Sequence, residues 1–164
     1  MKKFIKIACI VMILALTVTM FASCGGGEDS ADVKGETQTW GDITLFVPEE
    51  YTLKGGDMFG DEVPNRLTLN KGESSFEYIM VGSGYTEDEV DSSIEMTRSI
   101  NEGCEDIEIK AGANTWTGVA YNSLGVDCVS VSAPIGDGYV LITSAGAAKD
   151  DAAFNAVLES IVVK

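Results

Sequence analysis

An apolar run near the N-terminus limits most strongly what this chain of 164 residues can fold into. The run covers residues 7–21, carries no charge, and comes after Lys2, Lys3 and Lys6. About fifteen apolar residues behind a positively charged start are typical of a secretory signal, and they are few for a helix that spans a membrane permanently. Residues 1–23 are therefore predicted to be a signal peptide, and the fold has to form from the residues after position 23.

The residues that end this segment indicate how export finishes. Phe21, Ala22, Ser23 and Cys24 are consecutive, and this order of one apolar residue, two small residues and a cysteine resembles the lipobox of bacterial lipoproteins. Phe21 stands where that family usually has leucine. The resemblance implies that the Cys24 thiol receives a diacylglyceryl group and that a peptidase cuts just before it. An ordinary secretory signal with an incidental cysteine is the alternative.

Lipidation would place the protein on the extracytoplasmic face of the cell membrane, because two acyl chains give stable attachment. Removal of residues 1–23 takes away three of the 11 cationic residues and none of the 26 acidic ones, so the net charge falls from −15 to −18. Such a body is repelled by anionic lipid and by phosphate groups, so no nucleic-acid partner is expected. Residues 24–38, rich in glycine and charge, are predicted to be a flexible tether.

Residues 39–164 are predicted to form one domain. Apolar residues alternate with polar ones in several short segments, which favours β-strands separated by turns. Residues 67–69 and 76–81 are predicted to pair as a hairpin around Lys71-Gly72. The other expected strands are 43–47, 107–109, 116–121, 126–133 and 139–143.

Two helices are predicted among these strands. Thr86 and Glu89 have the spacing of a capping box, so a helix should start there, run to about Glu102 and stop at Gly103. The acidic residues of its first turns, including Asp91, are attributed to capping and to the helix dipole. A second helix should begin at Asp150 or Asp151 and bury Phe154, Val157, Leu158 and Ile161. The predicted fold is α+β, a single antiparallel sheet with a central helix and a C-terminal helix.

This order of elements resembles the small PsbP-like α/β/α sandwich found in photosystem accessory proteins and bacterial lipoproteins. The resemblance rests on the first strand with its terminal Pro48, strand 116–121, the turn at 137–138 and the closing helix 154–161, and it covers residues 39–164. It implies an accessory or protein-binding role without catalysis, although a fold alone does not define a function.

Residues that could carry chemistry are few. The chain has no histidine, which excludes Ser-His and Cys-His nucleophile pairs and histidine-ligated zinc. Gly82-Ser83-Gly84 is interpreted as a flexible loop rather than a phosphate cradle. Asp57, Asp61 and Glu62 could gather around calcium, although solvated acidic loops are common. No catalytic or metal-binding residue and no cofactor is predicted; the aromatic residues that could line a groove but favour the core are Trp40, Trp116, Tyr121 and Tyr139.

Two cysteines remain in the mature chain besides the lipidated one. Cys104 and Cys128 could form a disulfide, because an exported domain can meet an oxidising compartment. Two separately buried thiols are the alternative, since free cysteine packs well as a small apolar residue.

The leading hypothesis is a lipid-anchored extracytoplasmic accessory or binding module that is not an enzyme. Its expected partners are the membrane, through the anchor, and a protein at the cell envelope. A small carboxylate-dependent hydrolase and a calcium-responsive surface domain are the alternatives.

Overall fold

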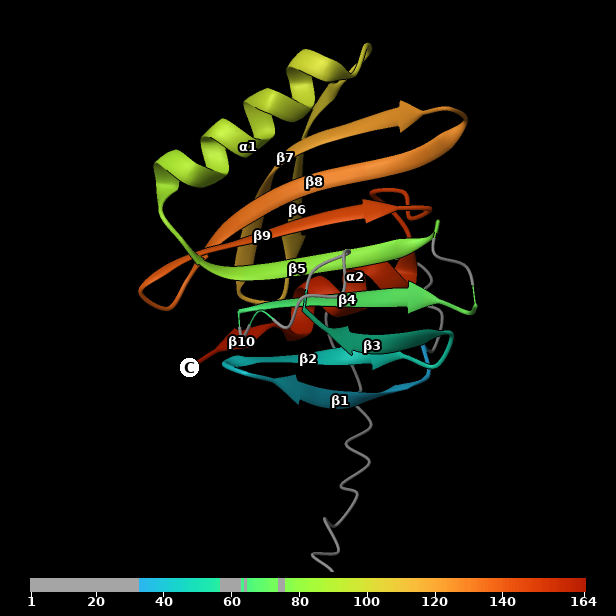
Figure 1. Ribbon diagram of the computed structural model, residues 1–164, viewed down its shortest axis with the longest axis vertical. Helices are drawn as coiled ribbons and strands as arrows, with labels where there is room; N and C mark the ends of the chain where they lie inside the picture. Colours follow the sequence, from blue (N-terminus) through green and yellow to red (C-terminus); the bar gives the residue numbers. More distant parts are fainter. Residues whose placement is uncertain (1–32, 57–62, 64, 74–75) are drawn as a thin grey trace, which may run out of the picture.

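The computed structural model describes residues 33–56, 63, 65–73 and 76–164 (Figure 1). The signal segment, Cys24 and the acidic loop residues Asp57, Asp61 and Glu62 lie outside the described residues. Strands dominate the described part, in the order β1 (Gly35–Trp40), β2 (Ile43–Pro48), β3 (Tyr51–Gly55), β4 (Arg66–Lys71), β5 (Tyr78–Tyr85), α1 (Glu87–Ile100), β6 (Glu105–Ala111), β7 (Asn114–Ser123), β8 (Val126–Ile135), β9 (Gly138–Ala145), α2 (Ala152–Ser160) and β10 (Val162–Val163).

The strands form two antiparallel sheets, and this makes the predicted single sheet of a PsbP-like α+β sandwich wrong. One sheet has three strands in the order β1-β2-β10, and the other has seven in the order β3-β4-β5-β9-β8-β7-β6. The difference arises at β2, which pairs with β1 on one side and with β10 on the other. Strand β2 is therefore the centre of its own small sheet instead of an extension of the large one.

Of the strands that were not predicted, β1 has no clear alternating pattern, whereas β3 alternates apolar and polar residues over only five positions. Strand β1 has the sequence GETQTW and is mostly exposed. It is a strand because its backbone pairs with β2, from Gly35↔Pro48 to Trp40↔Ile43, and not because its side chains are buried. It begins inside the segment expected to be tether. Strand β3 was also missed, and it pairs with β4. The predicted hairpin around Lys71-Gly72 is confirmed, because β4 pairs with β5. The other expected strands also pair with their neighbours in the chain, β6 with β7 and β8 with β9.

The two helices lie on opposite faces of the seven-stranded sheet (Figure 1). Helix α2 contacts β2 and β6, and it buries Ala153, Phe154, Val157 and Leu158 against the apolar faces of both sheets. The Asp151 side chain caps this helix by accepting from the Phe154 N–H at 2.8 Å. The predicted C-terminal helix is thus confirmed, and it forms the centre of the main core.

Helix α1 crosses β7, β8 and β9 on the outer face (Figure 1). Its capping box is present: the Thr86 N–H donates to a Glu89 carboxylate oxygen at 2.8 Å, and the Glu89 N–H donates to the Thr86 hydroxyl at 3.4 Å. The hydrogen bonds that the Glu89 carboxylate accepts from the Thr86 N–H and from the Thr86 hydroxyl hold the pKa of Glu89 below its usual range. The helix ends at Ile100 rather than Glu102, because the backbone of Asn101 is extended, with φ −118° and ψ 127°. The Asn101 side-chain amide donates to the Thr97 carbonyl at 2.9 Å and so caps this end.

Candidate binding clefts beside helix α1

Two hollows in the surface flank helix α1, because the helix anchors itself to the sheet by a narrow apolar stripe. Val90 and Ile94 are its buried residues. On one side lies a cleft of about 430 Å³, called here the acidic cleft; on the other lies a hollow of about 240 Å³, called the arginine pocket. The acidic cleft is lined by Asp91, Ile94, Glu95, Arg98, Asp106, Ile107, Thr117 and Gly118. The arginine pocket is lined by Arg66, Met80, Gly82, Tyr85, Glu89, Ser93, Leu141 and Thr143.

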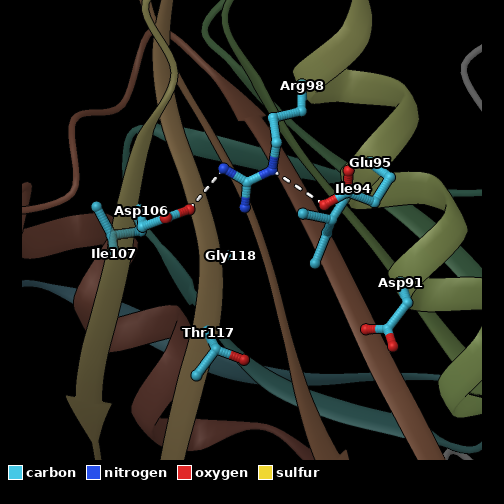
Figure 2. Close-up of a pocket in the computed structure, with 8 residues that line it drawn as sticks. All are labelled: Asp91, Ile94, Glu95, Arg98, Asp106, Ile107, Thr117 and Gly118. Atoms are coloured by element: carbon cyan, nitrogen blue, oxygen red, sulfur yellow. Dashed lines mark hydrogen bonds and ion pairs between the residues drawn. The ribbon is translucent and has the colours of Figure 1, made fainter.

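The helix wall of the acidic cleft follows from residue spacing. Asp91, Glu95 and Arg98 stand at i, i+4 and i+7, so they project from one side of the helix. Ile94 lies beside them and is 8% exposed, which fixes the helix against the sheet at this point. Figure 2 shows these side chains facing the residues of β6 and β7 across the cleft.

Arg98 joins the two walls of the acidic cleft. Its Nη1 lies 2.6 Å from Asp106 Oδ1 on β6, and its Nε lies 3.1 Å from Glu95 Oε1 on its own helix (Figure 2). The hydrogen bond to Asp106 is the main reason why the pKa of Arg98 is raised. Because charge-assisted pairs of this kind fix geometry, the bridge holds the end of α1 near β6.

Asp91 has a different environment from the other acidic residues of the cleft. The described residues give it no hydrogen bond and no ion pair, whereas Glu95 and Asp106 share Arg98. The lining therefore holds three carboxylates and one guanidinium, and Asp91 is the carboxylate without a cationic partner in the described part of the chain. Its charge also acts on Tyr139, whose pKa is raised by desolvation, by Glu87 and by Asp91.

Strand β7 contributes Thr117 and Gly118 to the sheet side of the acidic cleft. A Cβ atom added to Gly118 would collide with the Ser130 carbonyl of the neighbouring strand, so this position requires glycine. Thr117 places a hydroxyl beside it. The cleft therefore combines carboxylates, one hydroxyl and the apolar surface of two isoleucines, a mixture suited to binding a group that has both a charge and an apolar stem.

The sequence did not single out this cleft. The sequence explains Asp91 by helix capping and the helix dipole, and it does not mark Glu95, Arg98 or Asp106 as site residues. The i, i+4, i+7 spacing of the charged residues on α1 indicates in the sequence that they share one side of the helix. The position of Asp106 beside them cannot be predicted from the sequence, because it depends on how β6 returns next to the helix.

The aromatic residues expected in the core divide between two environments. Trp116 is fully buried, which confirms the core interpretation for it, and the ring of Trp40 packs against Gly55 at the edge of the core. Tyr121 and Tyr139 are half-buried and outside the main core cluster. The Gly82-Ser83-Gly84 segment belongs to strand β5, so its interpretation as a flexible loop was wrong.

Both cysteines of the folded domain are free thiols in the structure. Cys104 is half-buried after α1, and Cys128 is buried on β8. Burial raises the pKa of the Cys128 thiol. Their pairing in an oxidising compartment stays a prediction, and counting free thiols in the denatured, unreduced protein tests it.

Two other kinds of feature are absent from the described part of the chain. Among the described residues, no three histidine, cysteine or acidic side chains come close enough together to hold a metal ion. The same residues include no helix long and apolar enough to cross a membrane.

The pH dependence of stability tests the environment of Tyr121. Burial, together with Cys128, Tyr78 and Cys104, raises its pKa to about 12. A raised pKa favours the protonated phenol in the folded state, so this stabilisation is complete below pH of about 10 and is lost as the pH rises through about 12. In urea denaturation between pH 9 and pH 12, the stability of the wild type should fall more steeply than that of Tyr121→Phe. Identical pH dependence in the two proteins would contradict this environment.

Comparison with known proteins adds little to these observations. No family model matches this chain, and no curated protein matches it. Among solved structures, a protein from Bacteroides thetaiotaomicron is similar, with a TM-score of 0.42 and 11% sequence identity. The match covers 79% of this chain and 48% of that one, so this chain spans about half the length of that protein. A likeness at this level supports no inference about function.

Proposed function

We propose that this protein is a lipid-anchored binding module on the extracytoplasmic face of the cell membrane, without catalytic activity, and that its acidic cleft receives a positively charged group of a protein partner. The proposed binding role rests on Asp91. This carboxylate lies in a cleft of about 430 Å³ and has no cationic partner among the described residues. This volume lies in the usual range of ligand sites, roughly 300–1,000 Å³.

The cleft has the chemistry that a lysine or arginine side chain needs. Asp91 would accept a charge-assisted hydrogen bond from the ammonium or guanidinium group, and Ile94 lies beside it for the aliphatic stem. Arg98 is engaged by Asp106 and Glu95, so its charge is largely compensated at the cleft. The excess of acidic residues in the chain would also speed the encounter with a basic partner.

The anchor is supported by the sequence. Positive charge, an apolar run and the lipobox-like residues that end at Cys24 occur in the order that bacterial lipoproteins use. Residues 25–34 separate Cys24 from the first strand, so the domain would be attached near its small sheet. Binding at a membrane surface suits a module that holds a partner at the envelope.

A titration with a fluorescent lysine-rich peptide tests the cleft. Asp91→Asn should weaken binding by about tenfold or more, because a hydrogen bond to a charged group contributes about 1.5–3 kcal/mol. Glu102→Gln makes the same change in net charge at an exposed residue beyond α1, and it should leave the affinity within about twofold.

Two results would overturn this proposal. Equal weakening by Asp91→Asn and Glu102→Gln would show that the peptide responds to net charge and not to the cleft. Turnover of a glycan or a peptide by the purified protein at enzyme-like rates would contradict the absence of catalysis.

A further inference from the structure

We propose that the arginine pocket, on the other side of α1, is a second binding site and that it takes the carboxylate of a small apolar acid. This site is independent of the acidic cleft, because the two hollows share no lining residue. The two arginines of the chain, Arg66 and Arg98, lie in contrasting surroundings.

Arg66 lacks the partners that Arg98 has. Arg98 forms ion pairs with Glu95 and Asp106, whereas Arg66 forms none with the described residues. The Arg66 Nε is also shielded from solvent and has no hydrogen-bond acceptor among the described residues. A guanidinium without a carboxylate partner among the described residues keeps its charge available for an acidic ligand that enters the pocket.

The sheet holds the Arg66 side chain at the pocket. Arg66 on β4 pairs in register with Gly82 on β5, where the pairing with β9 has an irregularity between Gly82 and Tyr85. The guanidinium lies over the Tyr85 ring, 5.8 Å from its centroid. A Cβ added to Gly82 would lie 2.7 Å from the Tyr85 hydroxyl, so the absence of a side chain there makes room for this ring. Stacking on an aromatic face keeps a guanidinium in place with its edge available for a carboxylate.

The rest of the lining defines the class of ligand. Ser93 and Thr143 offer hydroxyl groups, and Met80 and Leu141 offer apolar surface. Glu89 contributes a negative charge, but its Oε2 already accepts from the Thr86 N–H and hydroxyl at 2.8 and 3.0 Å. One arginine and one glutamate make the lining neutral, which disfavours a multiply charged anion such as phosphate. A volume of about 240 Å³ limits the ligand to a small one.

The test is an NMR titration of the full-length protein in detergent with hexanoate, hexylamine and inorganic phosphate as probes. Hexanoate should shift the backbone amide signals of Gly82, Ser93 and Leu141 in a saturable way, and the other two probes should not. Arg66→Gln should weaken hexanoate binding by about tenfold or more, since it removes a charge-assisted pair. Lys110→Gln removes an equal charge from β6, at an exposed residue outside the pocket, and should leave the affinity within about twofold.

A second variant covers the case in which Arg66→Gln fails to fold. Ser93→Phe keeps the guanidinium and fills the pocket from the helix, so it should also abolish the hexanoate shifts. The proposal would be overturned by equal binding of phosphate, by equal binding of hexylamine, or by hexanoate shifts that survive Ser93→Phe in a folded protein. Absence of any saturable hexanoate shift in the wild type would overturn it as well.

Discussion

Replacing Cys24 by alanine is expected to release this protein from lipid modification completely. Metabolic labelling with a palmitate analogue should mark the wild-type chain and should be undetectable in Cys24→Ala. An uncleaved precursor should accumulate, because the peptidase of the lipoprotein family requires the lipidated cysteine. The physical reason is that, under the proposed lipidation, Cys24 would provide the sulfur to which the acyl-bearing group is attached, and no other residue in the lipobox-like sequence has a thiol.

Cys9→Ala is the matched control for this experiment. Cys9 lies inside the apolar run, and it is predicted to leave with the signal peptide. Labelling should therefore be unchanged in Cys9→Ala. Labelling that persists in Cys24→Ala would mean that the lipobox interpretation is mistaken and that the segment is an ordinary secretory signal.

Replacing Phe154 by alanine is expected to destabilise the domain by about 3–5 kcal/mol. Phe154 is fully buried on α2, the helix that lies between the small sheet and the inner face of the large one. Truncation to alanine removes apolar contacts and leaves a cavity that the surrounding strands cannot fill completely. Urea denaturation measures the loss as a lower midpoint at an unchanged slope.

Glu159→Ala provides the comparison on the same helix, because Glu159 is exposed. Its effect should stay within about 0.5 kcal/mol, as for most surface substitutions. A cost below about 1 kcal/mol for Phe154→Ala would contradict the position of α2 at the centre of the core.

The elements that could be predicted from the sequence are those with strong local signals. The capping box at Thr86 and Glu89 located the start of α1, and the apolar spacing from Phe154 to Ile161 located α2. Strands β2, β8 and β9 have the apolar residues that a buried strand requires. In each case the signal lies within the segment itself, so no knowledge of distant residues was needed.

The division into two sheets could not be predicted in this way. Strand β1 has little apolar character, and β10 consists of Val162 and Val163 alone, which is too short for an alternating pattern. Both are defined by pairing with β2, from opposite ends of the domain. Long-range pairing of this kind leaves no periodic signal in the sequence.

The binding clefts, too, could be predicted from the sequence only in part. The charged spacing of Asp91, Glu95 and Arg98 can be read on one helix, but Asp106 comes from another element. Glu95 stands three residues before Arg98 on the predicted helix and could be read as its partner, but no spacing in the sequence indicated whether Arg66 would be paired. The structure separates them, because one is paired with carboxylates and the other is not paired with any described residue.

Capture of a partner from solubilised membranes tests most directly whether the acidic cleft is the binding surface of an anchored module. The bait is the full-length protein as wild type, as Asp91→Asn and as Glu102→Gln, with Cys24→Ala as a control for anchoring. We expect one protein in stoichiometric amount with the wild type and with Glu102→Gln, and a clear loss of it with Asp91→Asn. A partner retained equally by Asp91→Asn, or no partner in stoichiometric amount with any of these proteins, would contradict the proposed role of the cleft.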